Sequence, residues 1–223
     1  MFSPEQNSLL SAKLDGSNVR TRSQAGQKLS YIEGWLAIAE ANRIFGFDGW
    51  DRETVWINCV WSGERQTKSG QKPAASYVAR VRITVRAGDR LVVREGTGAG
   101  SGFGFDAGEA HESAIKEAET DAMKRALMTF GNPFGLALYD KDKENVMSAQ
   151  EKAAADDRAI SETTAGTLTI AIEMAEDLGE LGAWWKQHWP QIDTLPNDLK
   201  AGVIAAKDKR KSQMSPPILQ AAE

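Results

Sequence analysis

The stretch of sequence that decides the fold is Tyr77-Val78-Ala79-Arg80-Val81-Arg82-Ile83-Thr84-Val85-Arg86. Its odd-numbered positions from 79 to 85 are apolar, and its even-numbered positions from 80 to 86 are polar. Because successive side chains of a strand point to opposite faces, this alternation predicts a strand that is buried on one side. Ala87-Gly88-Asp89 then predicts a turn into a second strand at Arg90–Glu95, and Trp50–Trp61 predicts a strand before it. Together they predict an antiparallel meander with one apolar and one cationic face.

Helical patterns flank this meander on both sides. Ser3-Pro4-Glu5-Gln6 has a capping box with a proline at the first helical position, and it predicts a helix that ends near Gly16. Apolar spacing predicts two more helices, at Tyr31–Phe45 and at Ala110–Phe130. We expect a polar, mobile segment at Val19–Gly26, a basic loop at Ser62–Pro73 and a glycine-rich loop at Gly96–Gly108. The predicted fold class is therefore α+β, with a three-stranded antiparallel β-meander packed on a long helix.

The C-terminal third of the chain differs in composition. Residues 139–161 are charged and rich in alanine, and short helices are predicted at Thr163–Leu178, Leu181–Trp189 and Pro196–Lys209. We therefore expect a domain at residues 1–145, a linker at 146–161, and a small helical appendage with a tail at 162–223. Trp184, Trp185 and Trp189 form either a small helical core or a patch that docks a partner protein.

Composition narrows the class of protein. Hydrophobic residues make up 41 % of the chain, which is enough for a core. No apolar run is long enough to cross a bilayer, and the N-terminus lacks the features of a signal peptide. Cys59, the single cysteine, excludes an intrachain disulfide framework and a multi-cysteine zinc site, and we expect it to be a small core residue. These features predict a cytoplasmic protein with no membrane contact.

The formal net charge of −4 lies entirely in the C-terminal part. Residues 1–147 hold 19 basic and 19 acidic residues, whereas the remainder holds eight basic and twelve acidic ones. Within the first part, residues 65–94 hold eight basic residues against Asp89 alone. Because salt screens charges beyond about 8–10 Å, local clustering matters more than the total for binding phosphate. The charge distribution thus permits nucleic-acid binding without proving it.

Patterns that would indicate an enzyme are incomplete. The glycine-rich stretch has neither a Gly-Lys-Ser/Thr ending nor the G-x-G-x-x-G spacing of a nucleotide-binding loop. His111-Glu112 begins like a zinc-protease helix, but Ile115 stands where the second histidine would be. The acids between Glu109 and Asp121 suggest a two-metal nuclease, yet they spread around several helix faces. We therefore predict no catalytic residue, no metal site and no cofactor, and a protein that is not an enzyme.

Lys124 and Arg125 lie in the last turns of the longest predicted helix. Spacing alone explains them as cations that interact favourably with the helix dipole, and Asp121 can pair with Arg125 at i,i+4. The alternating arginines at 80, 82 and 86 have a similar explanation as a solvated face. Three arginines in alternation repel one another, however, unless an anion or acidic neighbours oppose them.

Three blocks of sequence resemble the conserved domain of the Rad-fifty-two single-strand annealing proteins. The first is Gln27–Gly34 together with Ala41–Trp50, and the second is Arg80-Val81-Arg82-Ile83. The most specific block is Lys116–Asn132, which closes with Leu138–Asp142. The order and approximate spacing match over residues 9–145, and the compact chain resembles the phage and bacterial members of this family. The resemblance thus implies a protein of the cytoplasm of a bacterial or phage-infected cell.

The resemblance implies an ATP-independent protein that forms a homo-oligomeric ring. Single-stranded DNA would run around the ring in a basic groove, with its bases ready to pair during homologous recombination and DNA repair. It also implies protein partners for the C-terminal appendage, such as a single-strand-binding protein or a phage exonuclease. The alternative is a sequence-independent nucleic-acid chaperone or packaging module with no role in recombination.

The resemblance also implies roles for particular residues. The family's basic pair is matched by Lys124 and Arg125, its tyrosine by Tyr31, and its upstream arginine by either Arg20 or Arg22. Met128 stands where the family often has a third cation, so that contact is either lost or supplied by Arg82 or Lys28. The expected inner-groove residues are Lys124, Arg125, Tyr31, Arg22, Arg20, Lys28 and Arg82. A weaker outer DNA site is expected at Lys72, Arg80 and Arg86, and Phe103–Ala107 lacks the second lysine of the family's outer site.

Overall fold

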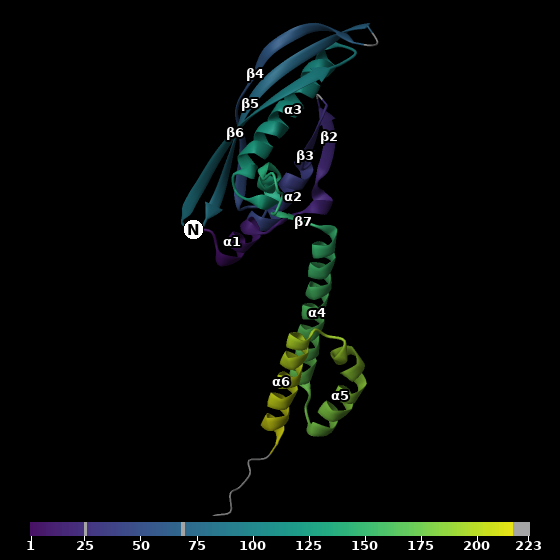
Figure 1. Ribbon diagram of the computed structural model, residues 1–223. Coiled ribbons are helices and arrows are strands. Elements are labelled where there is room, and N and C mark those ends of the chain that lie inside the picture. Colours follow the sequence, from purple (N-terminus) through teal and green to yellow (C-terminus); the bar gives the residue numbers. More distant parts are fainter. Residues whose placement is uncertain (25, 68–69, 216–223) are drawn as a thin grey trace, which may run out of the picture. The chain divides into compact units, whose positions relative to one another are not determined.

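The computed structural model describes residues 1–24, 26–67 and 70–215 (Figure 1). The chain divides into two compact units, Met1–Ala149 and Gln150–Glu223. Each unit has its own hydrophobic core. The two units are therefore described separately.

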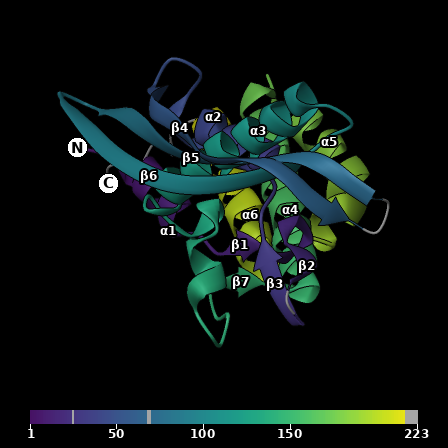
Figure 2. The ribbon, with the colours of Figure 1, turned by 90° about the horizontal axis from the view of Figure 1, so that it is seen from above.

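A three-stranded antiparallel sheet dominates the first unit. Its strands β4 (Trp50–Thr67), β5 (Gly70–Ala87) and β6 (Arg90–Phe103) lie in the order β4-β5-β6. Helix α3 (Ala107–Met128) covers one face of this sheet, as Figures 1 and 2 show. The alternating residues from Ala79 to Val85 are fully buried on that side. The predicted α+β class, with a meander packed on a long helix, is confirmed.

The expected glycine-rich loop is wrong, because most of it belongs to β6. Gly96–Gly102 pair with Val81–Ala75 of β5, and alternate glycines face α3. A Cβ atom on Gly98 would lie 2.2 Å from the backbone nitrogen of Ala122, and one on Gly100 would lie 2.3 Å from the backbone oxygen of Ala114. The facing residues of α3 are also small and fully buried: Ala110, Ala114, Ala118, Ala122 and Ala126. Glycine is therefore used here for close approach of helix and strand, and not for flexibility.

Two further segments are more regular than the sequence suggested. The basic loop expected at Ser62–Pro73 is wrong for the described residues, because β4 continues to Thr67 and β5 begins at Gly70. Residues 68 and 69 lie outside the described ranges. The Thr67 Oγ1 hydroxyl donates to the backbone oxygen of Gly70 at 2.7 Å. Cys59 is exposed on the edge strand β4, so its expected place in the core is wrong.

The expected mobile segment is a second hairpin. Strands β2 (Arg20–Gln24) and β3 (Gln27–Tyr31) pair from Arg20 with Tyr31 to Gln24 with Gln27. Gly26 has a φ of 80°, a left-handed value that glycine adopts without strain. The backbone N–H and C=O groups of these polar residues pair with each other across the hairpin. The two strands therefore form without a hydrophobic core of their own.

Short helices and a small parallel ladder close the first unit. Helix α1 (Pro4–Ser11) has the predicted Ser3 capping box, although it ends before Gly16, and α2 (Gly34–Phe45) ends at Gly46. The chain bends after α3 through η2 (Asn132–Phe134) and η3 (Leu136–Tyr139). Strand β1 (Leu14–Asp15), followed by η1 (Gly16–Asn18), pairs in parallel with β7 (Val146–Met147).

The second unit consists of three helices. They are α4 (Ala149–Met174), α5 (Leu178–Asp193) and α6 (Asn197–Met214). Residues 149–161, expected to be a linker, form the first half of α4. Trp184 and Trp185 pack against the core of this unit, whereas Trp189 is 40 % exposed.

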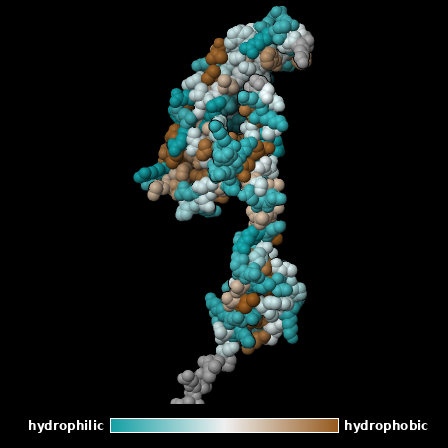
Figure 3. Space-filling model, viewed as in Figure 1, coloured by the Kyte–Doolittle hydropathy of each residue, from teal (hydrophilic) through white to brown (hydrophobic). Residues whose placement is uncertain are grey.

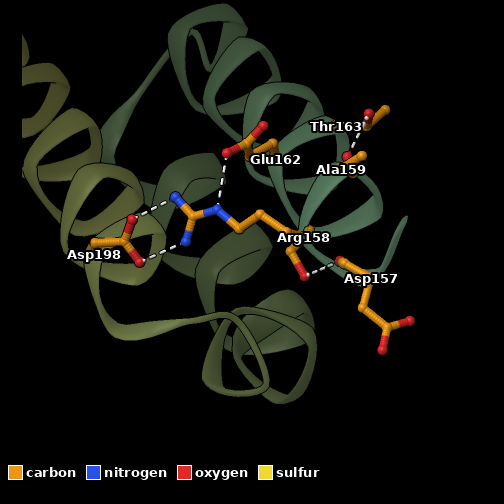
Figure 4. A network of polar contacts seen from close by, with 7 residues as sticks. Asp157, Arg158, Ala159, Glu162, Thr163 and Asp198 are labelled. Atoms are coloured by element: carbon orange, nitrogen blue, oxygen red, sulfur yellow. Dashed lines mark hydrogen bonds and ion pairs between the residues drawn. The ribbon is translucent and has the colours of Figure 1, made fainter. Parts of the chain in front are cut away.

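An ion pair joins α4 to α6 within the second unit. The Arg158 guanidinium donates to both carboxylate oxygens of Asp198, at 2.9 and 2.5 Å, and to Glu162 at 2.8 Å (Figure 4). These hydrogen bonds from Arg158 lower the pKa of Asp198 to about 2. Both side chains are about half exposed, so this pair adds geometric specificity at the start of α6 more than stability.

Apolar side chains form separate patches on the face that Figure 3 displays, among hydrophilic ones. In the described ranges, 1–24, 26–67 and 70–215, none of the helices combines the length and the apolar character that spanning a bilayer requires.

The close packing of β6 on α3 predicts the effect of one added methyl group. Gly98→Ala should lower the free energy of unfolding by about 1–3 kcal/mol or more, because the methyl group would collide with the backbone of α3. The adjacent Ala99 is exposed on the other side of β6, so Ala99→Ser should change the free energy by less than about 0.5 kcal/mol. Urea unfolding of the two variants measures both effects. Equal stability of the two variants would contradict the packing.

Candidate nucleic-acid interface

Two cations lie close to the ring of Tyr31 at the end of the β2–β3 hairpin. The Arg22 guanidinium carbon is 5.6 Å from the ring centroid, and the Lys124 Nζ is 5.7 Å from it. Both distances are within the range of about 6 Å for cation–π attraction. Lys124 Nζ also lies 3.4 Å from the backbone oxygen of Ile32, to which it donates. We call Tyr31, Arg22, Lys124 and Arg125 the Tyr31 cluster.

The packing of α3 fixes the position of Lys124. Its neighbours Ala122 and Met123 are buried against the sheet, so Lys124 emerges next to β3 and is half buried itself. Burial lowers the pKa of the Lys124 ammonium, Asp121 raises it, and the nearby Arg22 and Arg125 lower it further. A bound anion would therefore stabilise the charged form of Lys124.

Arg125 follows on the more exposed side of α3. Its Nε donates to Asp121 at 3.0 Å, which is the i,i+4 pair expected from the sequence and raises the pKa of Arg125. The Arg125 side chain is 54 % exposed. Such exposed ion pairs contribute little to stability, so Arg125 can turn to a phosphate at small cost.

The two faces of the β2–β3 hairpin carry different residues. Directly paired residues share a face, so Arg20 and Arg22 lie on the side of Tyr31, whereas Lys28 lies on the opposite side. Arg20 donates from Nη1 to the backbone oxygen of Ser17 at 2.9 Å. The structure therefore brings Arg22, Tyr31 and Lys124 together, and it places Lys28 elsewhere.

The arginines of β5 are neutralised by acidic neighbours on adjacent strands. Arg82 donates to Glu95 at 2.9 Å and to Glu53 at 3.1 Å. Arg80 pairs with Glu95 at 2.5 Å, and Arg86 pairs with Asp51 at 2.8 Å. The hydrogen bond from Arg82 lowers the pKa of Glu95. The expected cationic face is thus a mixed ionic face, because residues distant in sequence supply the opposing charge.

This ionic face is separate from the Tyr31 cluster. It lies on the side of the sheet that points away from α3, since the buried residues of β5 alternate with these arginines. Arg82 is therefore not brought to Lys124. Lys72 shares the face with Arg80 and Arg86 but lies near the far end of β5, where its Nζ is 4.7 Å from the centroid of the Phe105 ring.

Sequence reasoning missed Lys143 as a neighbour of this site. Its Nζ lies 3.0 Å from the Oγ of Ser30, the residue before Tyr31. The two residues are 113 positions apart, and no spacing rule links them. Only the bend after α3 brings this lysine to the hairpin.

Residues that could hold a metal do not gather in the described part of the chain. No group of three or more histidine, cysteine, aspartate or glutamate side chains occurs there. His111 forms a hydrogen bond of 2.8 Å with the Tyr77 hydroxyl through Nδ1. The glycine-rich stretch, being a strand against α3, does not have the form of a phosphate-cradling loop.

Comparison with known proteins identifies relatives of the first unit. Residues 4–157 match a family described as Rad52/22 family double-strand break repair protein. The chain is 41 % identical over 116 residues to DNA repair and recombination protein RAD52 of Eremothecium gossypii and 40 % identical over 120 residues to that of Saccharomyces cerevisiae. It is 39 % identical over 136 residues to DNA repair and recombination protein rad22 of Schizosaccharomyces pombe.

The matched segments cover 52 %, 52 % and 60 % of this chain, in that order. They cover only 25 %, 23 % and 28 % of the relatives, so the chain spans about a quarter of their length. The Tyr31 cluster lies inside the range that matches the family.

The charges around Lys124 predict that two substitutions shift its pKa in opposite directions. Arg22→Gln should raise the pKa of Lys124, because it removes a neighbouring positive charge. Asp121→Asn should lower it, because it removes a negative one. NMR titration of the Lys124 side chain measures both shifts, with the exposed Lys186 as a control that should not move. Shifts of the same sign in both variants would contradict the geometry of the cluster.

Proposed function

The chain belongs to the Rad52/22 family of double-strand break repair proteins, and from this premise we propose that it binds single-stranded DNA and anneals complementary strands. The proposed reaction uses no nucleotide and no metal, and it serves homologous recombination and DNA repair. The Tyr31 cluster is the single observation that carries this proposal.

The chemistry of the cluster suits sequence-independent binding of a single strand. Arg22, Lys124 and Arg125 supply cations for successive phosphates, and Tyr31 supplies a ring on which a base can stack. Among the described residues no carboxylate is ion-paired with Lys124, so its half-buried ammonium can pair with a phosphate without losing an existing ion pair. None of these contacts reads a base edge, so the other bases of the strand stay free to pair with a complement.

We also propose that the protein works as a homo-oligomeric ring. The sheet supports self-association, because both of its outer strands are open edges that carry exposed apolar side chains. These are Trp56 and Val60 on β4, and Leu91 and Val93 on β6. Docking of a single-strand-binding protein or an exonuclease on residues 150–215 stays a prediction.

Annealing gives the direct test of the function. The protein should accelerate pairing of complementary oligonucleotides in the absence of ATP and Mg²⁺, and Lys124→Met with Arg125→Met should abolish most of this acceleration. The double variant should stay folded, because the Arg125–Asp121 ion pair is largely exposed and methionine retains the apolar part of the lysine stem. An unchanged melting temperature would show that unfolding is not the cause of the lost activity.

Arg86→Met serves as the matched control, since Arg86 is a cation paired with Asp51 on the ionic face. It should retain annealing within about twofold, a change of about 0.4 kcal/mol. Annealing no faster than in buffer would refute the proposal. A preference for duplex or RNA over single-stranded DNA would favour a nucleic-acid chaperone instead.

Solution mass tests the ring. The protein should have a mass of many chains in solution, both alone and with single-stranded DNA. Leu91→Arg together with Val93→Arg should dissociate it, because charges on an edge strand oppose pairing with a neighbour. A mass of one chain under all conditions would contradict the ring and leave the DNA site to be tested by itself.

A further inference from the structure

The β2–β3 hairpin has a second face that the proposed function leaves unused. Cross-strand pairing places Thr21 opposite Ser30 and Ser23 opposite Lys28 on this face. All four residues are polar, and none of them is buried. Thr21, Ser23 and Lys28 are exposed, so this reverse face is open to a ligand.

Lys143 reaches the reverse face from the bend after α3. Its Nζ and the Ser30 Oγ are 3.0 Å apart, so the ammonium lies at the end of β3. Lys124 approaches the same end of β3 at Ile32. Two lysines thus bracket three consecutive residues of β3 and its exit, Ser30 to Ile32.

The backbone at Lys143 is held in an unusual conformation. Its φ is 51°, and it is the one non-glycine residue with positive φ in the described part of the chain. Lysine seldom adopts this left-handed conformation, whereas asparagine and glycine do so more readily. Hydrogen bonds on both sides hold the bend, from Lys143 N to Asp140 O and from Val146 N to Lys143 O, and β7 anchors it.

The charge of Lys143 is not neutralised by its acidic neighbours in sequence. Asp140, Asp142 and Glu144 surround it along the chain, yet its Nζ contacts a serine hydroxyl and forms no ion pair within the described residues. An ammonium held against a hydroxyl on an open polar face is a suitable donor to an anion. Lys28 lies on the same face and adds a second charge.

We propose that Lys143 and Lys28 form a second phosphate-binding site on the reverse face of the hairpin. The ligand is a backbone phosphate of the same single strand whose base stacks on Tyr31, so this inference rests on the proposed function. Ser30 and Tyr31 are consecutive, and their side chains point to opposite faces. A strand that crosses the end of the hairpin can therefore touch Lys124 on one side and Lys143 on the other.

The test compares charge removal with charge retention at one backbone position. Lys143→Asn removes the ammonium but tolerates the left-handed backbone, and Lys143→Arg keeps a positive charge. Lys141→Asn removes an exposed lysine two residues away, for which no hairpin contact occurs among the described residues. The salt dependence of binding to a fluorescent oligo(dT) strand is measured for each variant.

A plot of log K against log salt has a negative slope, and loss of one phosphate contact in Lys143→Asn should make that slope shallower by about 0.7. Lys143→Arg and Lys141→Asn should have the same slope as the wild-type protein, and Lys28→Gln should have a shallower one. An unchanged slope in Lys143→Asn, alongside a reduced slope in Lys124→Met, would overturn this site but leave the proposed function intact. Absence of binding by the unchanged protein would instead refute the proposed function.

Discussion

The close approach of α3 to β6 is the constraint on which the first unit depends. Alternate glycines on the strand and alanines at every fourth position on the helix allow the two backbones to pack without intervening side chains. This contact fixes the position and rotation of α3, and so determines where Lys124 and Arg125 emerge. A helix at ordinary side-chain distance from the sheet would carry the same cations away from Tyr31.

Part of this architecture could be predicted from sequence, since it depends on local periodicity. The alternation at residues 77–86 predicted the central strand, and the Ser3 capping box predicted the start of α1. The glycines at residues 96–104 predicted a loop, but most of them lie in β6. Glycine is typical both of flexible loops and of close backbone approach, so composition alone does not distinguish the two. The ion pairs of the β5 arginines were equally hidden, since Glu53 lies 29 residues from Arg82 and Glu95 lies 13 residues from it.

The candidate site, too, could be predicted from the sequence only in part. Lys124, Arg125 and Tyr31 lie in two sequence blocks that resemble the family, but only the hairpin register separates Arg22 from Lys28. Lys143 could not be found from sequence, because its place beside Ser30 results from the bend after α3 and the β1–β7 ladder. Burial lowers the pKa of the Lys124 ammonium, so a bound phosphate would stabilise its charged form.

Photo-crosslinking is the most direct measurement of where the strand lies. A single-stranded oligonucleotide that carries 5-iododeoxyuridine would be irradiated in complex with the intact protein, and the crosslinked residue identified by mass spectrometry. We expect the principal crosslink on Tyr31, since its ring, close to both Arg22 and Lys124, is the proposed stacking surface. Crosslinks confined to the ionic face of the sheet or to residues 150–215, with none in β3, would contradict it.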